Sequence, residues 1–330
     1  MLIKRTRGWE LPESAATSES DYRNRRDIIK QLSTGAFLAG SALAYGIGRP
    51  TRAIASTEDP SAHLYPVARN NAYQVPERDL TDEEDATTYN NYYEFGSSKN
   101  IHREAQALRI RPWEIQIDGM VEQPMTIDID TLLGRVQLEE RVYRHRCVER
   151  WAMTVPWCGF QMSQLVDIAR PLGSARYIRM QTQADEETMP NLSASWYPWP
   201  YTEGLTMAEA MNELTFLVTG MYGQPVPRQN GAPLRLAVPW KYGFKSVKSI
   251  VRFTFTDERP ISYWEELQSS EYGFWANVNP EVPHPRWSQA EEQLLTTREV
   301  VPTQIYNGYG EYVASLYDDI REDIGIWLYR

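Results

Sequence analysis

The sequence has little cysteine and little histidine. Two of its 330 residues are cysteine, Cys147 and Cys158, and four are histidine. Two cysteines cannot hold a cluster that needs four thiolates, and no haem-attachment motif is present. The histidines are scattered along the chain and do not form a zinc-binding pattern. Any electrons that the protein uses must therefore arrive from another protein.

The sequence also lacks an excess of positive charge and a glycine-rich nucleotide turn. Its 34 Lys and Arg residues are outnumbered by 44 Asp and Glu residues, so the formal net charge is −10. An acidic chain argues against nucleic acid as a partner. No G-x-G-x-x-G motif follows a predicted strand, which argues against a dinucleotide site.

Long hydrophobic runs are absent as well. The most apolar stretch, residues 32–47, is interrupted by Ser33, Thr34 and Ser41. It is shorter than the roughly 20 residues that cross a membrane, so a signal peptide is favoured over a membrane anchor. We therefore predict that residues 1–55 are an export signal.

The start of this segment indicates the export route. Arg25 and Arg26, followed by two isoleucines and a lysine, resemble the twin-arginine pattern, and residues 53–55 match an A-x-A cleavage site. We expect cleavage near Ala55 and a periplasmic location. The twin-arginine route exports folded proteins, which indicates a cofactor inserted before export.

The rest of the chain predicts one β-rich domain. Residues 56–85 are acidic and contain proline, which is typical of a surface linker, and residues 86–330 are predicted to form a single domain. The 11 Trp and 20 Tyr residues favour β-structure. Strand patterns and short helical patterns, including a capping box from Thr206 to Glu209 in a helix predicted to reach Leu214, mix without a βαβ rhythm. We therefore predict an α+β fold.

The stretch around Cys147 carries the strongest chemical signal. Arg144, Arg146 and Arg150 lie close to it in sequence, and nearby cations stabilise a thiolate, the form that ligates a metal. Cys147 follows a predicted strand and precedes an aromatic stretch, residues 151–157, predicted to be irregular. The alternative is a structural disulfide with Cys158, common in exported chains.

Several stretches together resemble a known family. Residues 143–149 read YRHRCVE, which resembles the cysteine segment of the molybdenum enzymes of the sulfite oxidase fold. Within these, the chain resembles the periplasmic protein-methionine-sulfoxide reductases. The segments that agree, in the same order, are residues 89–96, 229–235, 239–245, 277–280 and 284–288.

The resemblance implies a mixed β-rich molybdopterin-binding fold and a cofactor. The cofactor is Mo-molybdopterin, molybdenum with one pterin dithiolene, and Cys147 supplies the soft thiolate that completes the sulfur set of the metal. The residues that match cofactor-binding positions are Asn90, Tyr93, Glu94, Cys147, Thr182, Asn230, Arg235, Ser246, Val247 and Lys248.

Glu149 is our second candidate catalytic residue. It stands two residues after Cys147 and could hydrogen-bond a metal-bound water or the substrate. Sulfite oxidases carry a small residue and soon a paired arginine here, which helps to hold an anion. An acidic residue disfavours sulfite and suits a neutral sulfoxide.

The resulting hypothesis is a molybdenum oxidoreductase that repairs methionine sulfoxide in oxidised periplasmic proteins. The resemblance implies a haem-containing, quinol-linked membrane subunit as the electron donor. Aromatic residues at 196–199 and 272–275 either flank the site and hold a thioether stem or simply pack at the surface. The alternatives are a sulfite dehydrogenase and a non-enzymatic, disulfide-stapled binding module.

Overall fold

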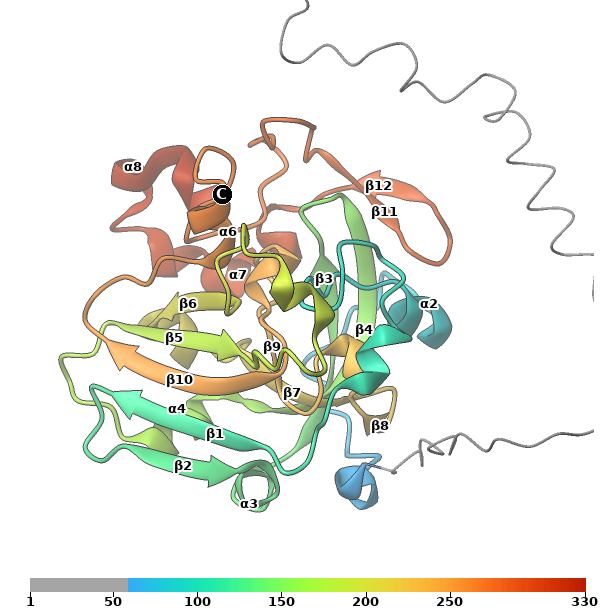
Figure 1. The fold of residues 1–330 in the computed structure, drawn as a ribbon. Coiled ribbons are helices and arrows are strands. Elements are labelled where there is room, and N and C mark those ends of the chain that lie inside the picture. The colour runs from blue at the N-terminus through green and yellow to red at the C-terminus, as the bar shows by residue number, and fades with distance from the viewer. Residues whose placement is uncertain (1–58) are drawn as a thin grey trace, which may run out of the picture. The chain divides into compact units, whose positions relative to one another are not determined.

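Two β-sheets form the framework of the protein in the computed structural model, which describes residues 59–330 (Figure 1). These residues belong to one compact unit, Thr57–Arg330. The predicted signal over residues 1–55, with Arg25, Arg26 and the cleavage site near Ala55, lies outside the described residues. Within the described part, no helix is long and apolar enough to cross a membrane.

One sheet has five strands in the order β2–β1–β10–β5–β6. β1 and β10 are parallel, and the other neighbours are antiparallel. In β5, Ile178, Met180 and Thr182 are buried and the residues between them are half-buried, so the chain alternates between two faces. The strands are β1 (Glu114–Gly119), β2 (Met125–Asp128), β5 (Tyr177–Thr182), β6 (Thr202–Thr206) and β10 (Ile250–Thr256).

The other sheet has seven strands, with β12–β11–β4–β7–β8 in order, β3 paired to β4 and β9 paired to β7. Its longest strand, β4, is buried at every position except the last. Such a strand is covered on both faces. The strands are β3 (Glu139–Arg146), β4 (Trp151–Gln161), β7 (Phe216–Met221), β8 (Gln224–Pro225), β9 (Arg235–Ala237), β11 (Glu291–Leu294) and β12 (Val300–Pro302).

Strand β4 corrects the prediction of an irregular stretch over residues 151–157. Pro156 favoured that prediction because proline cannot donate a backbone hydrogen bond to a sheet. Pro156 lies opposite Val142, whose N–H donates to the carbonyl of Tyr73 instead of to β4. β7 pairs with β4 only from Trp157 onward. Pro156 therefore occupies a position at which neither neighbour requires its N–H group.

The helices are short. α5 (Met207–Met211) has the predicted capping box between Thr206 and Glu209, but it ends before the predicted Leu214. The Asn212 side chain accepts a hydrogen bond from the Leu214 N–H, which turns the chain out of the helix. The fold is α+β, as predicted. The other helices are α2 (Glu83–Thr88), α3 (Ile129–Leu133), α4 (Met162–Ala169), α6 (Tyr263–Leu267), α7 (Gly310–Val313) and α8 (Arg321–Ile324).

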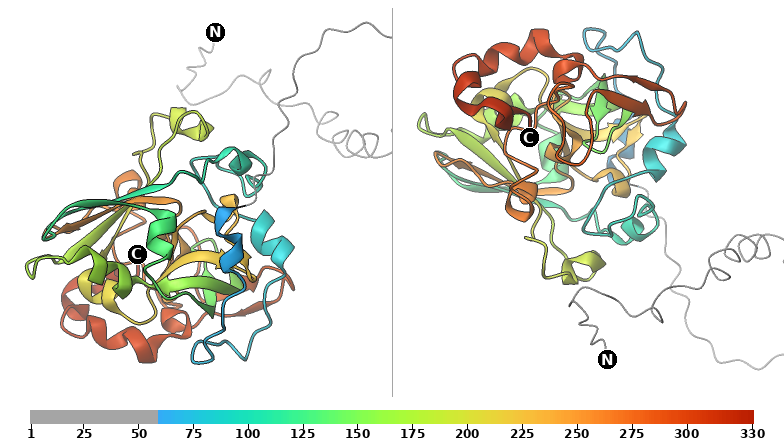
Figure 2. Two further views of the ribbon diagram at one scale, coloured as in Figure 1. Left: turned by 90° about the horizontal axis from the view of Figure 1, so that it is seen from below. Right: turned by 90° about the horizontal axis from the view of Figure 1, so that it is seen from above.

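Two connecting segments matter for the site. The N-terminal one, residues 59–85, hydrogen-bonds to the seven-stranded sheet: the Glu140 N–H donates to the Ala68 carbonyl, and the Thr81 N–H donates to the Thr154 carbonyl. The other lies between β5 and β6 and stands out from the body of the protein (Figure 2). It contains one turn of 3-10 helix, Pro190–Ser193, and no strand.

Candidate active site

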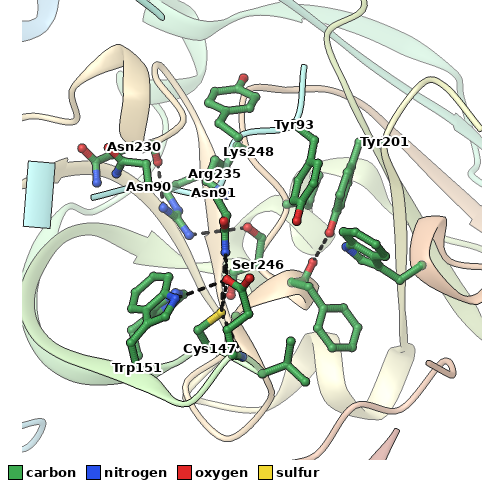
Figure 3. Close-up of a pocket in the computed structure, with 18 of the residues that line it drawn as sticks. Asn90, Asn91, Tyr93, Cys147, Trp151, Tyr201, Asn230, Arg235, Ser246 and Lys248 are labelled. Atoms are coloured by element: carbon green, nitrogen blue, oxygen red, sulfur yellow. Dashed lines mark hydrogen bonds between the residues drawn. The ribbon is translucent and has the colours of Figure 1, made fainter. Parts of the chain in front are cut away.

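A pocket of about 310 Å³ is lined by segments that lie far apart in the sequence (Figure 3). They include residues 89–94, the hairpin between β3 and β4, and the loop between β9 and β10. The pocket brings together every predicted site residue, although the role of each toward a cofactor stays a prediction. These residues are Asn90, Tyr93, Glu94, Cys147, Glu149, Thr182, Asn230, Arg235, Ser246, Val247 and Lys248.

Cys147 lies at the tip of the hairpin that joins β3 to β4. Its N–H donates to the Trp151 carbonyl at 2.9 Å, and the Arg150 N–H donates to the Cys147 carbonyl at 3.0 Å. Arg150 closes the turn in the left-handed region, with φ 73°. Cys147 is only 5% exposed. The hairpin therefore fixes the thiol against the pocket and shields it from bulk water.

Burial of the Cys147 thiol outweighs the lowering effect of Arg146 on its pKa, so the predicted activation by the neighbouring arginines is wrong. Arg146 donates to Glu292 at 2.8 Å, Arg144 to Gln304 at 2.8 Å, and Arg150 lies 3.5 Å from Glu291. Burial, with the nearby Glu149 carboxylate, raises the pKa of Cys147 to about 12. Ligation by a metal deprotonates a thiol outright and does not need these arginines.

The alternative of a disulfide between the two cysteines is also wrong, because both are free thiols. Cys158 lies opposite Glu140 on the β3–β4 ladder, whereas the Cys147 N–H donates a hydrogen bond to the Trp151 carbonyl at the tip of the hairpin. Seven residue-to-residue steps along the strand lead from Trp151 to Cys158, a distance of about 24 Å. A disulfide cannot span that separation, so the interpretation as a disulfide-stapled module loses its basis.

Glu149 is held as a carboxylate beside Cys147. It accepts hydrogen bonds from Lys99 at 2.6 Å and from Asn91 at 2.8 Å, and its Oε2 lies 3.6 Å from Cys147 Sγ. Burial raises the pKa of Glu149, but the hydrogen bonds from Lys99, Asn91 and Trp151 outweigh burial and hold it below its ordinary value. A negative charge therefore stands at the thiol.

Sequence reasoning missed Asn91 and Lys99. The Asn91 amide also donates to Cys147 Sγ at 3.6 Å, and Lys99 donates to Asn91 Oδ1 at 2.5 Å. The position of Asn91 between Asn90 and Tyr93 was the only available signal. Nothing in the sequence pointed to Lys99, because Lys99 reaches Asn91 only after the loop between these two residues folds back.

Three buried polar atoms at the pocket have no hydrogen-bond partner among the described residues. They are Oδ1 of Asn90, Oδ1 of Asn230 and Oγ1 of Thr182. Both asparagine amides donate to the Ala86 carbonyl, Asn230 at 2.9 Å and Asn90 at 3.4 Å, so their oxygens are left over. Unsatisfied buried acceptors cost free energy, which favours a ligand that brings N–H donors.

Two cations share the same pocket. Arg235 is 3% exposed and donates to the carbonyls of Asn230 at 2.7 Å and Ser246 at 3.4 Å. Burial lowers the pKa of Arg235 to about 10. Burial and the neighbouring Arg235 lower the pKa of Lys248 to about 7. Two desolvated cations that repel each other favour a bound anion such as phosphate.

The remaining predicted residues build the walls. The carbonyl of Val247 accepts from the Leu236 N–H at 2.9 Å, and the Ser246 carbonyl holds Arg235. Burial raises the pKa of Glu94 to about 7. The ring of Tyr93 packs edge to face on Trp264, with centroids 5.0 Å apart.

The predicted aromatic flanks of the site are only partly correct. Tyr272 lines the pocket, but Trp196 and Trp199 do not. The aromatic side chains that do line it, apart from the tyrosines of residues 89–94, are Trp151, Tyr201, Phe244, Trp264, Tyr272 and Trp287.

Comparison with known proteins agrees with this chemistry. Residues 102–264 match the family described as the oxidoreductase molybdopterin binding domain. The chain is 46% identical to the protein-methionine-sulfoxide reductase catalytic subunit MsrP of Burkholderia mallei, over 96% of this chain and 97% of that protein. The chain belongs to this reductase family.

Other relatives give the same assignment. The MsrP proteins of Xanthomonas axonopodis and Ralstonia nicotianae are 42% and 44% identical, over 93% and 98% of this chain and 95% and 99% of theirs. Among solved structures, the sulfane dehydrogenase SoxCD of Paracoccus pantotrophus aligns with TM-score 0.46 and 16% identity, over 69% of this chain and 59% of that one.

The reductase relatives and the family model confirm the family predicted from the sequence, and they make the protein a molybdopterin-dependent oxidoreductase. The pocket of this reductase fits the cofactor, because it offers a soft thiol, leftover acceptors for the donors of a pterin, and paired cations for a phosphate.

Proposed function

We propose that the protein is a molybdenum enzyme that reduces methionine sulfoxide residues in periplasmic proteins and so repairs oxidative damage. The observation that carries this proposal is the position of Cys147, which lies beside a charged Glu149 in a pocket with unsatisfied acceptors and two desolvated cations, Arg235 and Lys248. Membership of the reductase family supports the same conclusion.

Different pocket residues would bind different parts of a molybdenum cofactor with a single pterin. Cys147 would ligate the metal, Asn90, Asn230 and Thr182 would accept hydrogen bonds from the pterin, and Arg235 and Lys248 would meet the phosphate. When bound, this group supplies oxygen-atom transfer and electron transfer. The protein supplies a buried thiolate, fixed orientation and exclusion of water.

Glu149 supports a neutral substrate. Its carboxylate stays ionised because Lys99 and Asn91 donate to it. Because Lys99 is already paired with this carboxylate, the two side chains offer no free positive charge to an anion such as sulfite, whereas a sulfoxide carries no net charge and needs none. Overall, the sulfoxide takes up two electrons and two protons and gives a thioether and water, which restores an apolar side chain.

The electrons come from outside the chain. Its two cysteines cannot hold an iron–sulfur cluster. The resemblance to the reductase family implies a haem-containing, quinol-linked membrane subunit as the donor, and we propose that the reaction takes place in the periplasm, after twin-arginine export. The predicted signal over residues 1–55 supports this location.

Steady-state kinetics test the proposal. Purified, cofactor-loaded protein is given reduced viologen with either an oxidised protein or free methionine sulfoxide, and sulfite oxidation is measured beside them. We expect turnover of both sulfoxides and little sulfite oxidation. Robust sulfite oxidation without sulfoxide reduction would overturn the proposal in favour of a sulfite dehydrogenase.

A further inference from the structure

We propose that residues 185–199, here called the docking arm, bind the polypeptide on either side of the oxidised methionine. This inference rests on the proposed function and names how that substrate is held. The docking arm stands out from the body between β5 and β6 (Figure 2). It is therefore available to a large partner.

The docking arm is fastened to the wall of the pocket. The Asn191 N–H donates to the Glu94 carbonyl at 3.0 Å, and the Asn191 side chain donates to the Tyr93 carbonyl at 2.7 Å. Glu94 and Tyr93 both line the pocket. Two hydrogen bonds from one residue thus fix the arm beside the site.

An aromatic path runs along the arm from the pocket to the surface. The ring of Tyr93 lies 6.2 Å from that of Tyr197, which lies 5.9 Å from that of Trp196. Trp196 is 73% exposed, the largest fraction among the exposed large apolar side chains of residues 59–330. A tryptophan rarely stays this exposed, and aromatic side chains that do are typical of binding surfaces.

The burial of the site commits the arm to one occupant. Cys147 lines the pocket and is 5% exposed, so a sulfoxide that reacts beside it must enter on its own side chain while the substrate backbone stays at the rim. Extended chain advances about 3.3–3.6 Å per residue. The two ring-to-ring steps place the Trp196 ring no farther than about 12 Å from the Tyr93 ring at the pocket wall, which corresponds to at most about three or four residues. We expect Trp196 to contact an apolar side chain within four residues of the oxidised methionine.

Paired peptides test this contact. Each carries one methionine sulfoxide, with either Phe or Ser at the positions three and four residues before and after it. kcat/KM is measured with a viologen donor for the wild type, for Trp196→Ala and for Trp327→Ala. Trp327 is the matched control, because it is 42% exposed and does not line the pocket.

The wild type and Trp327→Ala should prefer the Phe peptide by about tenfold, the effect of burying one large apolar contact. Trp196→Ala should abolish the preference. If the wild type shows no preference for the Phe peptide, or if Trp196→Ala keeps the preference unchanged, the proposal that the docking arm binds the substrate is wrong.

Calorimetric binding of both peptides without an electron donor separates this inference from the proposed function. If the protein binds the Phe peptide more tightly in a Trp196-dependent way but reduces no sulfoxide, the docking arm binds peptide as proposed and the proposed function is wrong. Reduction of both peptides with equal binding and equal kcat/KM would contradict the docking arm alone.

Discussion

Cys147 is the residue on which the chemistry depends. Replacing Cys147 by Ser should lower sulfoxide turnover by about 100-fold or more, because an alcohol is a harder and less acidic ligand than a thiol. Viologen-linked reduction of methionine sulfoxide measures the loss. Wild-type turnover in Cys147→Ser would contradict the assignment of the ligand.

Cys158→Ala is the matched control for that variant. Cys158 is fully buried on β4, its Sγ lies 3.7 Å from Glu140, and it does not line the pocket. We expect its replacement to preserve turnover. A loss equal to that of Cys147→Ser would show that removal of either thiol acts through folding.

At this scale, the sequence predicted the members of the site but not their electrostatics. The resemblance gave Cys147 and nine other residues, the position of Glu149 after Cys147 gave one more, and one pocket contains them all. It could not show that Arg146 is neutralised by Glu292, because 146 residues separate the two. It could not show Lys99 beside Glu149 for the same reason.

At the scale of the element, a buried ion pair ties the five-stranded sheet to the loop that carries the predicted cofactor residues 246–248. Glu203 on β6 meets Lys245 at 2.7 Å, and neither side chain is exposed. Burial, opposed by Lys245, raises the pKa of Glu203 to about 7 from its ordinary value of 4.5. The pair therefore holds the loop in place, and its contribution to the free energy of unfolding depends on pH.

This shift sets the sign of a pH dependence. Between pH 4.5 and 7 the folded protein holds a proton on Glu203 that the unfolded chain releases, so Glu203 makes the unfolding free energy fall as pH rises. Glu203→Gln should remove this fall, at most about 1.4 kcal/mol per pH unit. Above pH 7, where Glu203 is ionised in the folded protein, the variant should be less stable, because Lys245 loses its charged partner.

Urea unfolding of the apoprotein at several values between pH 4.5 and 7 measures this slope. Glu258→Gln, which changes an exposed carboxylate, should keep the wild-type slope. A wild-type slope in Glu203→Gln would mean that Glu203 is already ionised at pH 4.5 in the folded protein.

Strands whose residues clearly alternate between two faces were predictable from the sequence. Elements whose bounds depend on contacts with neighbouring strands or side chains were not. The sequence predicts a strand over residues 177–182, and β5 has these bounds because its residues alternate between two faces. β4 was missed because Pro156 is tolerated only through the positions of Val142 and β7. The end of α5 was missed because a side-chain bond from Asn212 decides it.

At the scale of the whole molecule, we expect export to follow folding. The double variant Arg25→Lys with Arg26→Lys should block export and leave cofactor-loaded precursor in the cytoplasm, because the twin-arginine route recognises the pair and carries folded protein. Immunoblots of periplasmic and cytoplasmic fractions, with pterin analysis of each, check this. Normal periplasmic accumulation of the double variant would contradict the predicted route.

The central claim is that this pocket holds molybdenum through Cys147. X-ray absorption at the molybdenum edge, on wild type and Cys147→Ser purified from a host that makes the cofactor, tests it most directly. We predict near-stoichiometric molybdenum in the wild type and one fewer sulfur ligand per metal in the variant. A wild type without molybdenum, or a variant with an unchanged number of sulfur ligands, would contradict the account.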